Sequence, residues 1–255
     1  MSRLAGVLAP TLFVALLLGV WEAACRLLHV PQYFLPPPSA IGRALVDNAP
    51  LLATSAARTL GTALAALLTA SLIANSLALI ASFSGLLESS FRPLVVAIQV
   101  TPIVALAPLF QVWAGVDHPD RAVIALATMA AFFSIYSGTS GGLKAADPDL
   151  VRLLDLYGAS RWQKLVKLRL PSSIPYVLEG HKVAMGLALV GAVVGEFSAG
   201  AGGAQGLAWR ILEASNRLEM DKSFAALATL ALMAAGVHLV FLGVERRALA
   251  WWRGR

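Results

Sequence analysis

The sequence predicts an all-α, polytopic membrane protein with about six transmembrane helices. Apolar residues make up 58% of the 255 residues, charged residues make up 13%, and the mean hydropathy is +0.74. A soluble domain of this size carries about a quarter charged residues. Apolar runs of about 20 residues recur along the chain, and each is long enough to cross about 30 Å of hydrocarbon. We expect one transmembrane domain over residues 1–255.

The apolar runs define six spans. They run over Leu4–Leu28, Ala56–Phe83, Phe91–Ala114, Arg121–Leu143, Ile174–Ala199 and Phe224–Val244. Arg3 precedes the apolar core of the first run, so a cleavable signal peptide is the competing interpretation. The apolar character continues to Leu28, with Trp21 near the far end, and we therefore favour an uncleaved first span.

Basic residues predict the side on which each loop lies. The loop between the fourth and fifth spans and the C-terminal tail concentrate lysine and arginine. These residues are Lys144, Arg152, Arg161, Lys164, Lys167, Arg169, Arg246, Arg247, Arg253 and Arg255. An even number of spans places both segments and the N-terminus on one side, which the positive-inside bias makes cytoplasmic. The net charge of +6 therefore follows from loop orientation, and we expect no nucleic-acid partner.

The opposite side holds three segments of mixed charge. They are Val30–Ser55, Gly115–Asp120 and Gly200–Lys222. Leu35–Ser39 reads Leu-Pro-Pro-Pro-Ser and cannot continue a helix. We expect Ser39 to cap a short surface helix over Ala40–Asn48.

A charged, amphipathic island, Asp147–Pro175, lies between two long apolar segments. Asp147-Pro148 is a helix start, because Asp accepts hydrogen bonds from free N–H groups and Pro fits the first turn. One apolar face follows at i, i+3, i+4 and i+7, formed by Leu150, Leu153, Leu154 and Tyr157. Gly158 can adopt the left-handed conformation that ends this helix.

A second short helix begins directly, because Ser160–Gln163 has the S-x-x-Q pattern of a capping box. Its apolar stripe consists of Trp162, Leu165 and Val166 and extends to Arg169. Pro171 and Pro175 are expected to end this helix and return the chain to the membrane. The pattern also fits an amphipathic helix that lies flat on the inner leaflet. Two capped helices that meet at one glycine favour a compact, rigid protrusion that can meet a soluble partner.

The island resembles the second half of the cytoplasmic EAA loop, which marks the membrane subunits of bacterial ABC importers. Gly158-Ala159-Ser160 is followed by Leu168-Arg169-Leu170-Pro171, with nine residues between Gly158 and Leu168. The family's Glu-Ala-Ala triplet would fall at Arg152, Leu153 and Leu154, so its acidic and small residues are replaced here.

Further stretches are similar to the branch of that family that handles nitrate, sulfonates, taurine and thiamine-type pyrimidines. They are Phe34–Pro38, Thr101–Leu109, Val112–Gly115 and Gly206-Leu207. The likeness extends from about Phe34 to the end of the sixth span. Relatives often have arginine three residues before the proline at Pro102, where this chain has Gln99.

The resemblance implies a permease domain over residues 1–255, with a type I importer fold and a cytoplasmic coupling loop at about residues 144–173. Such a subunit moves a small polar solute from periplasm to cytoplasm by alternating access. The solute would be a sulfonate- or nitrate-like anion, or a pyrimidine- or flavin-type compound. The implied partners are a second permease copy, two ATPase subunits and a periplasmic substrate-binding protein. ATP and Mg²⁺ would bind the ATPase, and we expect no cofactor in this chain.

In such a subunit the loop docks into a groove on the ATPase. The candidate coupling residues are Leu154, Tyr157, Gly158, Ala159, Ser160, Arg161, Trp162, Lys164, Leu165 and Pro171. Tyr157, Trp162 and Leu165 are expected to form an apolar plug, and Arg161 and Lys164 to make polar contacts.

Polar residues within the spans are candidates for a substrate path, because polar groups in hydrocarbon usually face a bundle interior or a wet cavity. They are Gln99, Thr101, Gln111, Tyr136 and Glu196. Pro102 and Pro108 interrupt the third span, and a broken helix can line a cavity, so Pro102 joins this set. The competing interpretation is a kinked helix packed on its neighbours. Glu196 is a gate or pathway residue, a carboxylate at the water interface, or a structural partner of Arg210 or Arg217.

Small residues recur in the fifth span and predict close helix packing, within the subunit or across a dimer. They are Gly180, Ala184, Gly186, Ala188, Gly191 and Gly195. We find no catalytic motif, and no Cys/His cluster has metal-ligand spacing. Gly138–Lys144 does not satisfy the phosphate-loop pattern. The alternative functions are a stand-alone secondary transporter or channel, for which Glu196 is the one candidate ion site, and an intramembrane enzyme.

Overall fold

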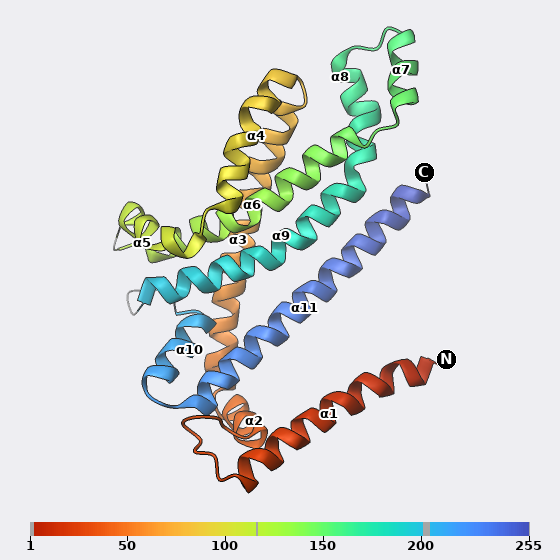
Figure 1. Ribbon diagram of the computed structural model, residues 1–255. Coiled ribbons are helices and arrows are strands. Elements are labelled where there is room, and N and C mark those ends of the chain that lie inside the picture. Colours follow the sequence, from red (N-terminus) through yellow and green to blue (C-terminus); the bar gives the residue numbers. More distant parts are fainter. Residues whose placement is uncertain (1–2, 116, 201–204, 255) are drawn as a thin grey trace. The chain divides into compact units, whose positions relative to one another are not determined.

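The computed structural model describes residues 3–115, 117–200 and 205–254. Within these ranges the regular elements are helices (Figure 1). They are α1 (Arg3–Leu27), α2 (Pro38–Asp47), α3 (Ala49–Ala81), α4 (Gly85–Val100), α5 (Ile103–Ala114), α6 (Pro119–Lys144), α7 (Pro148–Leu156), α8 (Arg161–Lys164), the π-helical turn η1 (Leu165–Arg169), α9 (Leu170–Ala199), α10 (Leu207–Asn216) and α11 (Met220–Arg253). The predicted all-α class is confirmed. Residues 201–204, part of a predicted outer segment, lie outside the described residues.

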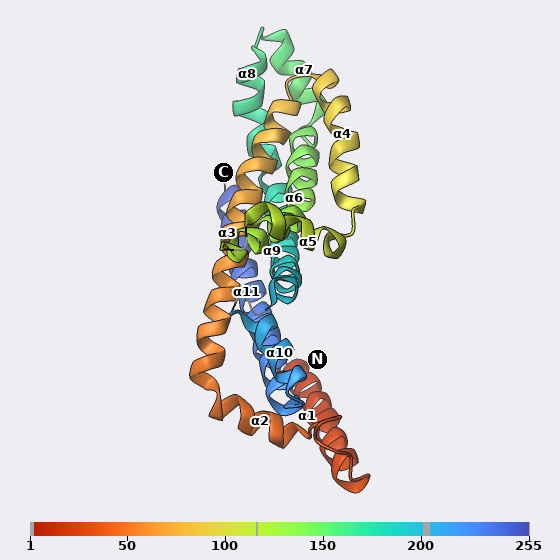
Figure 2. The ribbon, with the colours of Figure 1, turned by 90° about the vertical axis from the view of Figure 1, so that its left-hand side faces the viewer.

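The chain forms two compact units. The first holds Met1–Ala57 and Gln205–Leu232, and the second holds Arg58–Ala204 and Met233–Arg255. All the predicted coupling and path residues fall in the second unit. Its centre is the pair α6 and α9, which lie side by side in both views (Figures 1 and 2).

The described residues hold fewer candidate membrane spans than the six predicted, and one of them differs in shape. Four helical segments of the described chain are long and apolar enough to cross a membrane, namely Ala49–Ala81, Pro119–Lys144, Arg161–Ala199 and Met220–Trp252. The pair α4 and α5 adds a fifth if it counts as one span. Helix α1 occupies the first predicted span, and its 25 residues cover about 37 Å at about 1.5 Å per residue.

The third predicted span is not one straight helix. Helices α4 and α5 are bent by 100° at Thr101-Pro102. Thr101 takes an extended conformation (φ −73°, ψ 126°), as the residue before a proline prefers. The second predicted interruption, at Pro108, is wrong: α5 continues through it. A proline removes only one backbone donor from the helix, and here that loss does not end α5.

The predicted break at Pro171 and Pro175 is also wrong. The chain runs from α8 through η1 into α9 as one helical segment, Arg161–Ala199. The wider π-helical turn ends at Arg169, just before Leu170 and Pro171, so the regular hydrogen-bond pattern is already altered where the proline N–H is missing. Pro175 offers no N–H to the Pro171 carbonyl one turn earlier, and this carbonyl accepts a hydrogen bond from Trp252 Nε1 at 2.8 Å.

Helices α6 and α9 pack through glycine and alanine. A Cβ added to Gly191 would lie 2.6 Å from Cα of Ala127, and one added to Gly138 would lie 2.8 Å from the Tyr176 carbonyl oxygen. Five of the six small residues predicted to pack closely are buried at this seam or beside it, namely Gly180, Ala184, Ala188, Gly191 and Gly195. The contact predicted either within the subunit or across a dimer is therefore made within the subunit. Gly186 instead faces open space.

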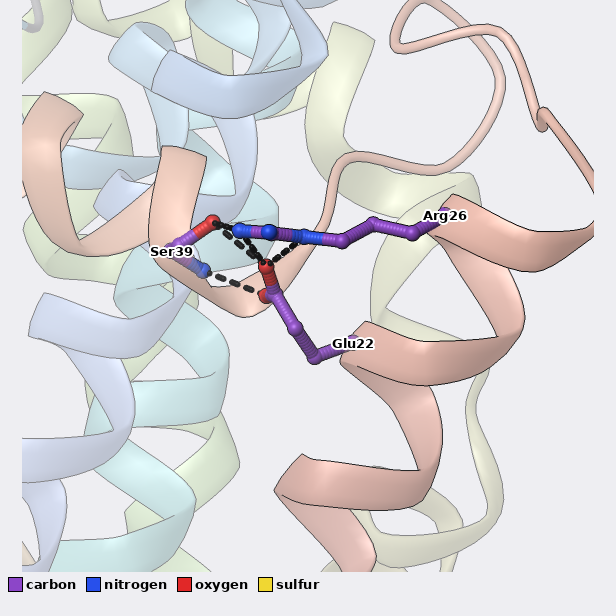
Figure 3. A network of polar contacts seen from close by, with 3 residues as sticks. All are labelled: Glu22, Arg26 and Ser39. Carbon is purple, nitrogen blue, oxygen red and sulfur yellow. Dashed lines mark hydrogen bonds and ion pairs between the residues drawn. The ribbon is translucent and has the colours of Figure 1, made fainter.

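In the first unit, α1 holds the N-terminus of α2 (Figure 3). The Glu22 carboxylate accepts hydrogen bonds from the backbone N–H of Ser39 at 2.9 Å, from its hydroxyl at 2.8 Å, and from Arg26 Nε at 2.7 Å. The prediction that Ser39 caps this helix is wrong, because α2 begins at Pro38 with Pro37 as its N-cap. A carboxylate is favourable at this position because the first N–H groups of a helix are free and carry partial positive charge.

A pair of alanine substitutions tests the seam between α6 and α9. Gly191→Ala places a methyl against the α6 backbone and is expected to lower the free energy of unfolding by about 1–3 kcal/mol. Gly186→Ala meets nothing within 4 Å and is expected to leave that free energy unchanged or raise it by up to about 1 kcal/mol. Thermal unfolding of both variants in detergent gives the comparison, and equal melting shifts would contradict the seam.

Candidate functional site

The knob, residues 147–164, consists of α7 and α8 and projects from one end of α6 and α9 (Figures 1 and 2). Helix α7 begins as predicted, since the Asp147 side chain accepts a hydrogen bond from the backbone N–H of Asp149 at 2.8 Å. It ends at Gly158, which has φ +68°. Two backbone bonds close this end, from Ala159 N–H to the Leu154 carbonyl and from Gly158 N–H to the Asp155 carbonyl. This pair of bonds defines a Schellman motif.

Helix α8 starts on the predicted capping box. The Ser160 hydroxyl accepts from the backbone N–H of Gln163 at 3.2 Å, and the Gln163 side chain accepts from the backbone N–H of Ser160 at 2.7 Å. Only four residues therefore separate the end of α7 at Leu156 from the start of α8 at Arg161. The corner between the two helices is fixed by hydrogen bonds that depend on local sequence.

The knob is also braced by contacts between distant residues. Lys164 forms an ion pair with Asp155 and so ties α8 to α7. Arg161 Nη1 donates to the Phe83 carbonyl at 3.3 Å, and the Trp162 ring stacks on the Phe83 ring with centroids 6.2 Å apart. The knob is therefore fixed to the segment that follows α3, and it is not free to swing about its corner.

The apex of the knob is apolar and exposed. No residue of α7 is buried. Leu156 and Tyr157 are 86% and 81% exposed, whereas Leu165 is only 4% exposed. Leu165 therefore packs inside the chain and is not available as part of the predicted apolar plug. Leu156 was missed because it lies off the i, i+3, i+4, i+7 face.

The other predicted coupling residues fall into two groups. Leu154, Gly158, Ala159 and Ser160 supply the backbone and capping bonds of the corner. Arg161 and Lys164, expected to contact a partner, make contacts within the chain instead, and the ring of Trp162 remains 63% exposed. Pro171 lies beyond the knob, where its carbonyl joins α9 to α11 through Trp252.

The predicted substrate-path residues occupy two environments. Gln99 and Pro102 lie exposed at the bend between α4 and α5, with Thr101 and Gln111 half-buried nearby in sequence. Tyr136 is buried against Phe132, with ring centroids 6.1 Å apart. Glu196 is 2% exposed and accepts a hydrogen bond from Thr59 at 2.8 Å. Glu196 is thus buried within the chain, not a carboxylate at the water interface.

A chain of hydrogen bonds that the sequence analysis missed joins α3, α6 and α9. Thr139 donates to the Asn75 side-chain oxygen, Asn75 donates to Ser71 Oγ at 3.0 Å, and Ser71 lies 2.8 Å from His181 Nε2. His181 Nδ1 lies 2.8 Å from the Val177 carbonyl, which can only accept, so Nδ1 donates this bond. Ser71 and Asn75 share one helix face at i and i+4, which was the available signal.

Lys182 links α9 to α11. Its ammonium lies 3.1 Å from a carboxylate oxygen of Glu245 and also pairs with Glu179. The sequence analysis did not single out Lys182. Together with the Trp252 bond to Pro171, this ion pair fixes the end of α11 beside the beginning of α9.

The structure defines a helical integral membrane protein with a rigid protrusion continuous with one of its spans. Residues 66–248 match the family described as binding-protein-dependent transport system inner membrane component, and the chain belongs to that family. It is a permease of the ABC transporter class and an inner-membrane protein. Members of the family work with ATPase and substrate-binding partners.

Individual relatives agree with the family. The chain is 31% identical over 221 residues to a probable ABC transporter permease protein of Haemophilus influenzae, covering 87% of this chain and 88% of the relative. It is 34% identical over 203 residues to the formylaminopyrimidine transport permease protein ThiX of Halalkalibacterium halodurans, covering 77% and 78%. It is 32% identical over 241 residues to the riboflavin transport system permease protein RibX of Chloroflexus aurantiacus, covering 93% and 87%.

Substitutions at Gly158 test the corner of the knob. Gly158→Val forces a branched side chain into the left-handed region and is expected to cost about 1–2 kcal/mol of local stability. Gly158→Asn is expected to cost less, because asparagine tolerates that conformation. Amide hydrogen exchange across α7 measures both variants, and exchange that is equally fast in the two would contradict the requirement for a left-handed residue.

Proposed function

We propose that this chain is the permease subunit of an ATP-driven importer that moves a small polar solute from periplasm to cytoplasm by alternating access. The knob is the surface that docks on the ATPase. The observation that carries the proposal is an exposed apolar apex on a braced two-helix corner, in a chain that belongs to the binding-protein-dependent family.

The orientation of the knob follows from its charges and from the C-terminal end. The loop and the tail are both rich in lysine and arginine, which places them in the cytoplasm. The bond between Trp252 and the Pro171 carbonyl supports this assignment, because it puts the end of α11 and the beginning of α9 on the same side. The N-terminus lies in the cytoplasm as well if α1 and the α4–α5 pair each cross once.

Coupling acts through a continuous lever. The segment Arg161–Ala199 carries the motion of the knob into the membrane without a break, and the seam passes it from α9 to α6. ATP-driven closure of the ATPase dimer shifts the equilibrium of the permease only if the ATPase binds the two permease states with different affinity. Because the corner and the following helix are stiff, a change in the position of the docked knob also changes the arrangement of the spans.

The residues of the knob take separate roles in this proposal. Leu156 and Tyr157 fill the ATPase groove, with Trp162 at its rim. Gly158, Ala159 and Ser160 set the corner, while Arg161 and Lys164 brace it. The family's Glu-Ala-Ala triplet is replaced here by Arg152, Leu153 and Leu154. The facing part of the ATPase groove therefore accommodates one cation and two larger apolar side chains.

The proposed assembly has a second permease copy, two ATPase subunits that bind ATP and Mg²⁺, and a periplasmic substrate-binding protein. We favour a pyrimidine- or flavin-type solute over a sulfonate- or nitrate-like anion. Gln99 stands where relatives often have arginine, a residue suited to an anion, and the names of ThiX and RibX refer to a formylaminopyrimidine and to riboflavin. Gln99, Thr101, Pro102 and Gln111 line the path at the bend, and Tyr136 and Glu196 shape it from the core.

A matched pair of variants tests docking. The permease is coexpressed with its cognate ATPase subunit, and the amount of copurified ATPase is measured. Leu156→Ala combined with Tyr157→Ala is expected to reduce it by about tenfold or more, since one aromatic anchor at an interface centre contributes about 2 kcal/mol or more. Tyr33→Ala removes a tyrosine of similar exposure (61%) on the opposite side and is expected to leave it unchanged.

Retention of the ATPase by the double variant would contradict the proposed docking surface. Loss of the ATPase in Tyr33→Ala to the same extent would do so as well, because the effect would then follow from general destabilisation.

A further inference from the structure

A small cationic hollow lies at the base of the knob. Its volume is about 170 Å³, and its walls are Ser82, Phe83, Arg161, Lys164, Leu165 and Arg169. None of these six described residues is acidic. A water needs only about 10–15 Å³ of such space, so the hollow holds several waters or one group of phosphate size. A second hollow, of about 290 Å³, shares Ser82 and Arg169 and adds Lys144 and Glu88.

Two of the cations around these hollows lack a carboxylate. Lys164 is paired with Asp155, and Lys144 is paired with Glu88. Arg161 donates only to the Phe83 carbonyl, and Arg169 makes no hydrogen bond or ion pair with any described residue. Two guanidinium groups therefore face one hollow with no anion between them. Arginine presents planar, paired N–H donors that suit phosphate oxygens.

The two hollows, which share Ser82 and Arg169, lie at the ends of three helices of the second unit. Ser82 and Phe83 follow the end of α3, Lys144 is the last residue of α6, and Arg169 directly precedes α9. Each of these helices belongs to a segment long and apolar enough to span the bilayer. The stacked rings of Phe83 and Trp162 at this level fit the aromatic belt found at membrane interfaces. The hollow is therefore at headgroup depth.

We infer that this hollow binds the phosphate group of an anionic phospholipid, with Arg161 and Arg169 as its main ligands. Basic pockets between transmembrane helices are known sites for phospholipid headgroups, and each lysine or arginine near an anionic surface contributes about 1 kcal/mol. The position at the membrane boundary favours a lipid phosphate over a free one. A bound headgroup would neutralise the base of the knob and anchor it to the bilayer.

This site stands apart from the proposed function, because a headgroup can occupy it whether or not the knob meets an ATPase. It also differs from an amphipathic helix that lies flat on the lipid. The contact is a single hollow at the base of the knob, and the apex remains free.

Native mass spectrometry of the full chain with phosphatidylglycerol tests the site, with phosphatidylcholine as the zwitterionic comparison. The double variant Arg161→Gln, Arg169→Gln is expected to bind phosphatidylglycerol about 25-fold more weakly, from about fivefold for each cation. Arg152→Gln removes the same charge from the same loop outside the hollow and is expected to change nothing. Arg169→Lys keeps the charge and is expected to retain part of the phosphatidylglycerol binding. This milder variant replaces the double variant where the latter folds poorly.

Two further arms separate the sources of the phosphate. Inorganic phosphate is added to the detergent-solubilised protein without lipid, and the melting midpoint is followed. No shift is expected in the millimolar range. A shift that the double variant abolishes would preserve the phosphate chemistry and the arginine ligands but overturn the lipid as its source.

Unchanged phosphatidylglycerol binding by the double variant, or an equal loss in Arg152→Gln, would overturn the site. The two arginines would then only brace the end of α3, whose last carbonyls attract cations. If the double variant kept its lipid but lost the copurified ATPase, the hollow would belong to the protein partner. A knob that faced the outside would defeat the proposed function yet leave the lipid result unchanged, so the two failures are distinguishable.

Discussion

The close contact between α6 and α9 is the constraint on which the second unit depends. Glycine at several points of the seam lets backbone meet backbone, as where Gly138 approaches the Tyr176 carbonyl. Small residues drive helix association in lipid because no hydrophobic force distinguishes a neighbouring helix from the lipid chains. The seam reaches from Gly195 against Val123 at one end to Gly142 against Ser173 at the other, just below the knob. Any motion of α9 must therefore involve α6.

The knob extends this rigid body into water. Its corner is held by backbone bonds at Gly158 and by the capping box of Ser160, and its base is held by Arg161 and Trp162 on Phe83. Prolines in the following segment do not interrupt the helix, because the π-helical turn and the Trp252 bond accommodate them. The apex is thus connected through η1 to α9 and its seam with α6, and through Phe83 to the end of α3.

Local chemistry could be predicted from the sequence, and long-range packing could not. The start of α7 at Asp147, the left-handed Gly158 and the capping box of Ser160 each depend on residues within three or four positions of one another, and each is confirmed. The burial of Leu165 depends on the fold, and the stacking of Trp162 depends on a residue almost eighty positions earlier. The cap supplied by Glu22 to α2 was missed for the same reason.

The intramembrane polar residues show the same limit. Polarity within a span identified Glu196, but Thr59, its partner, has no signal of its own in the sequence. Ser71, Asn75, Thr139 and His181 form one network only because the seam and α3 bring three helices together. The prolines led us to predict more helix breaks than the structure has. One proline lies at the 100° bend of the α4–α5 pair, while those at the start of α9 leave the helix continuous. Proline marks a missing donor, and the surroundings decide whether the helix ends there.

Accessibility of a single cysteine at the apex is the most direct test that the knob is a cytoplasmic docking surface. Cys25, the only native cysteine, is buried, so Tyr157→Cys supplies one reactive thiol and Tyr33→Cys supplies a counterpart in a segment expected to be periplasmic. A membrane-impermeant maleimide is predicted to label Tyr157→Cys only in inside-out vesicles, and bound ATPase is predicted to protect it. Labelling from the periplasmic side, or labelling unaffected by the ATPase, would contradict the account.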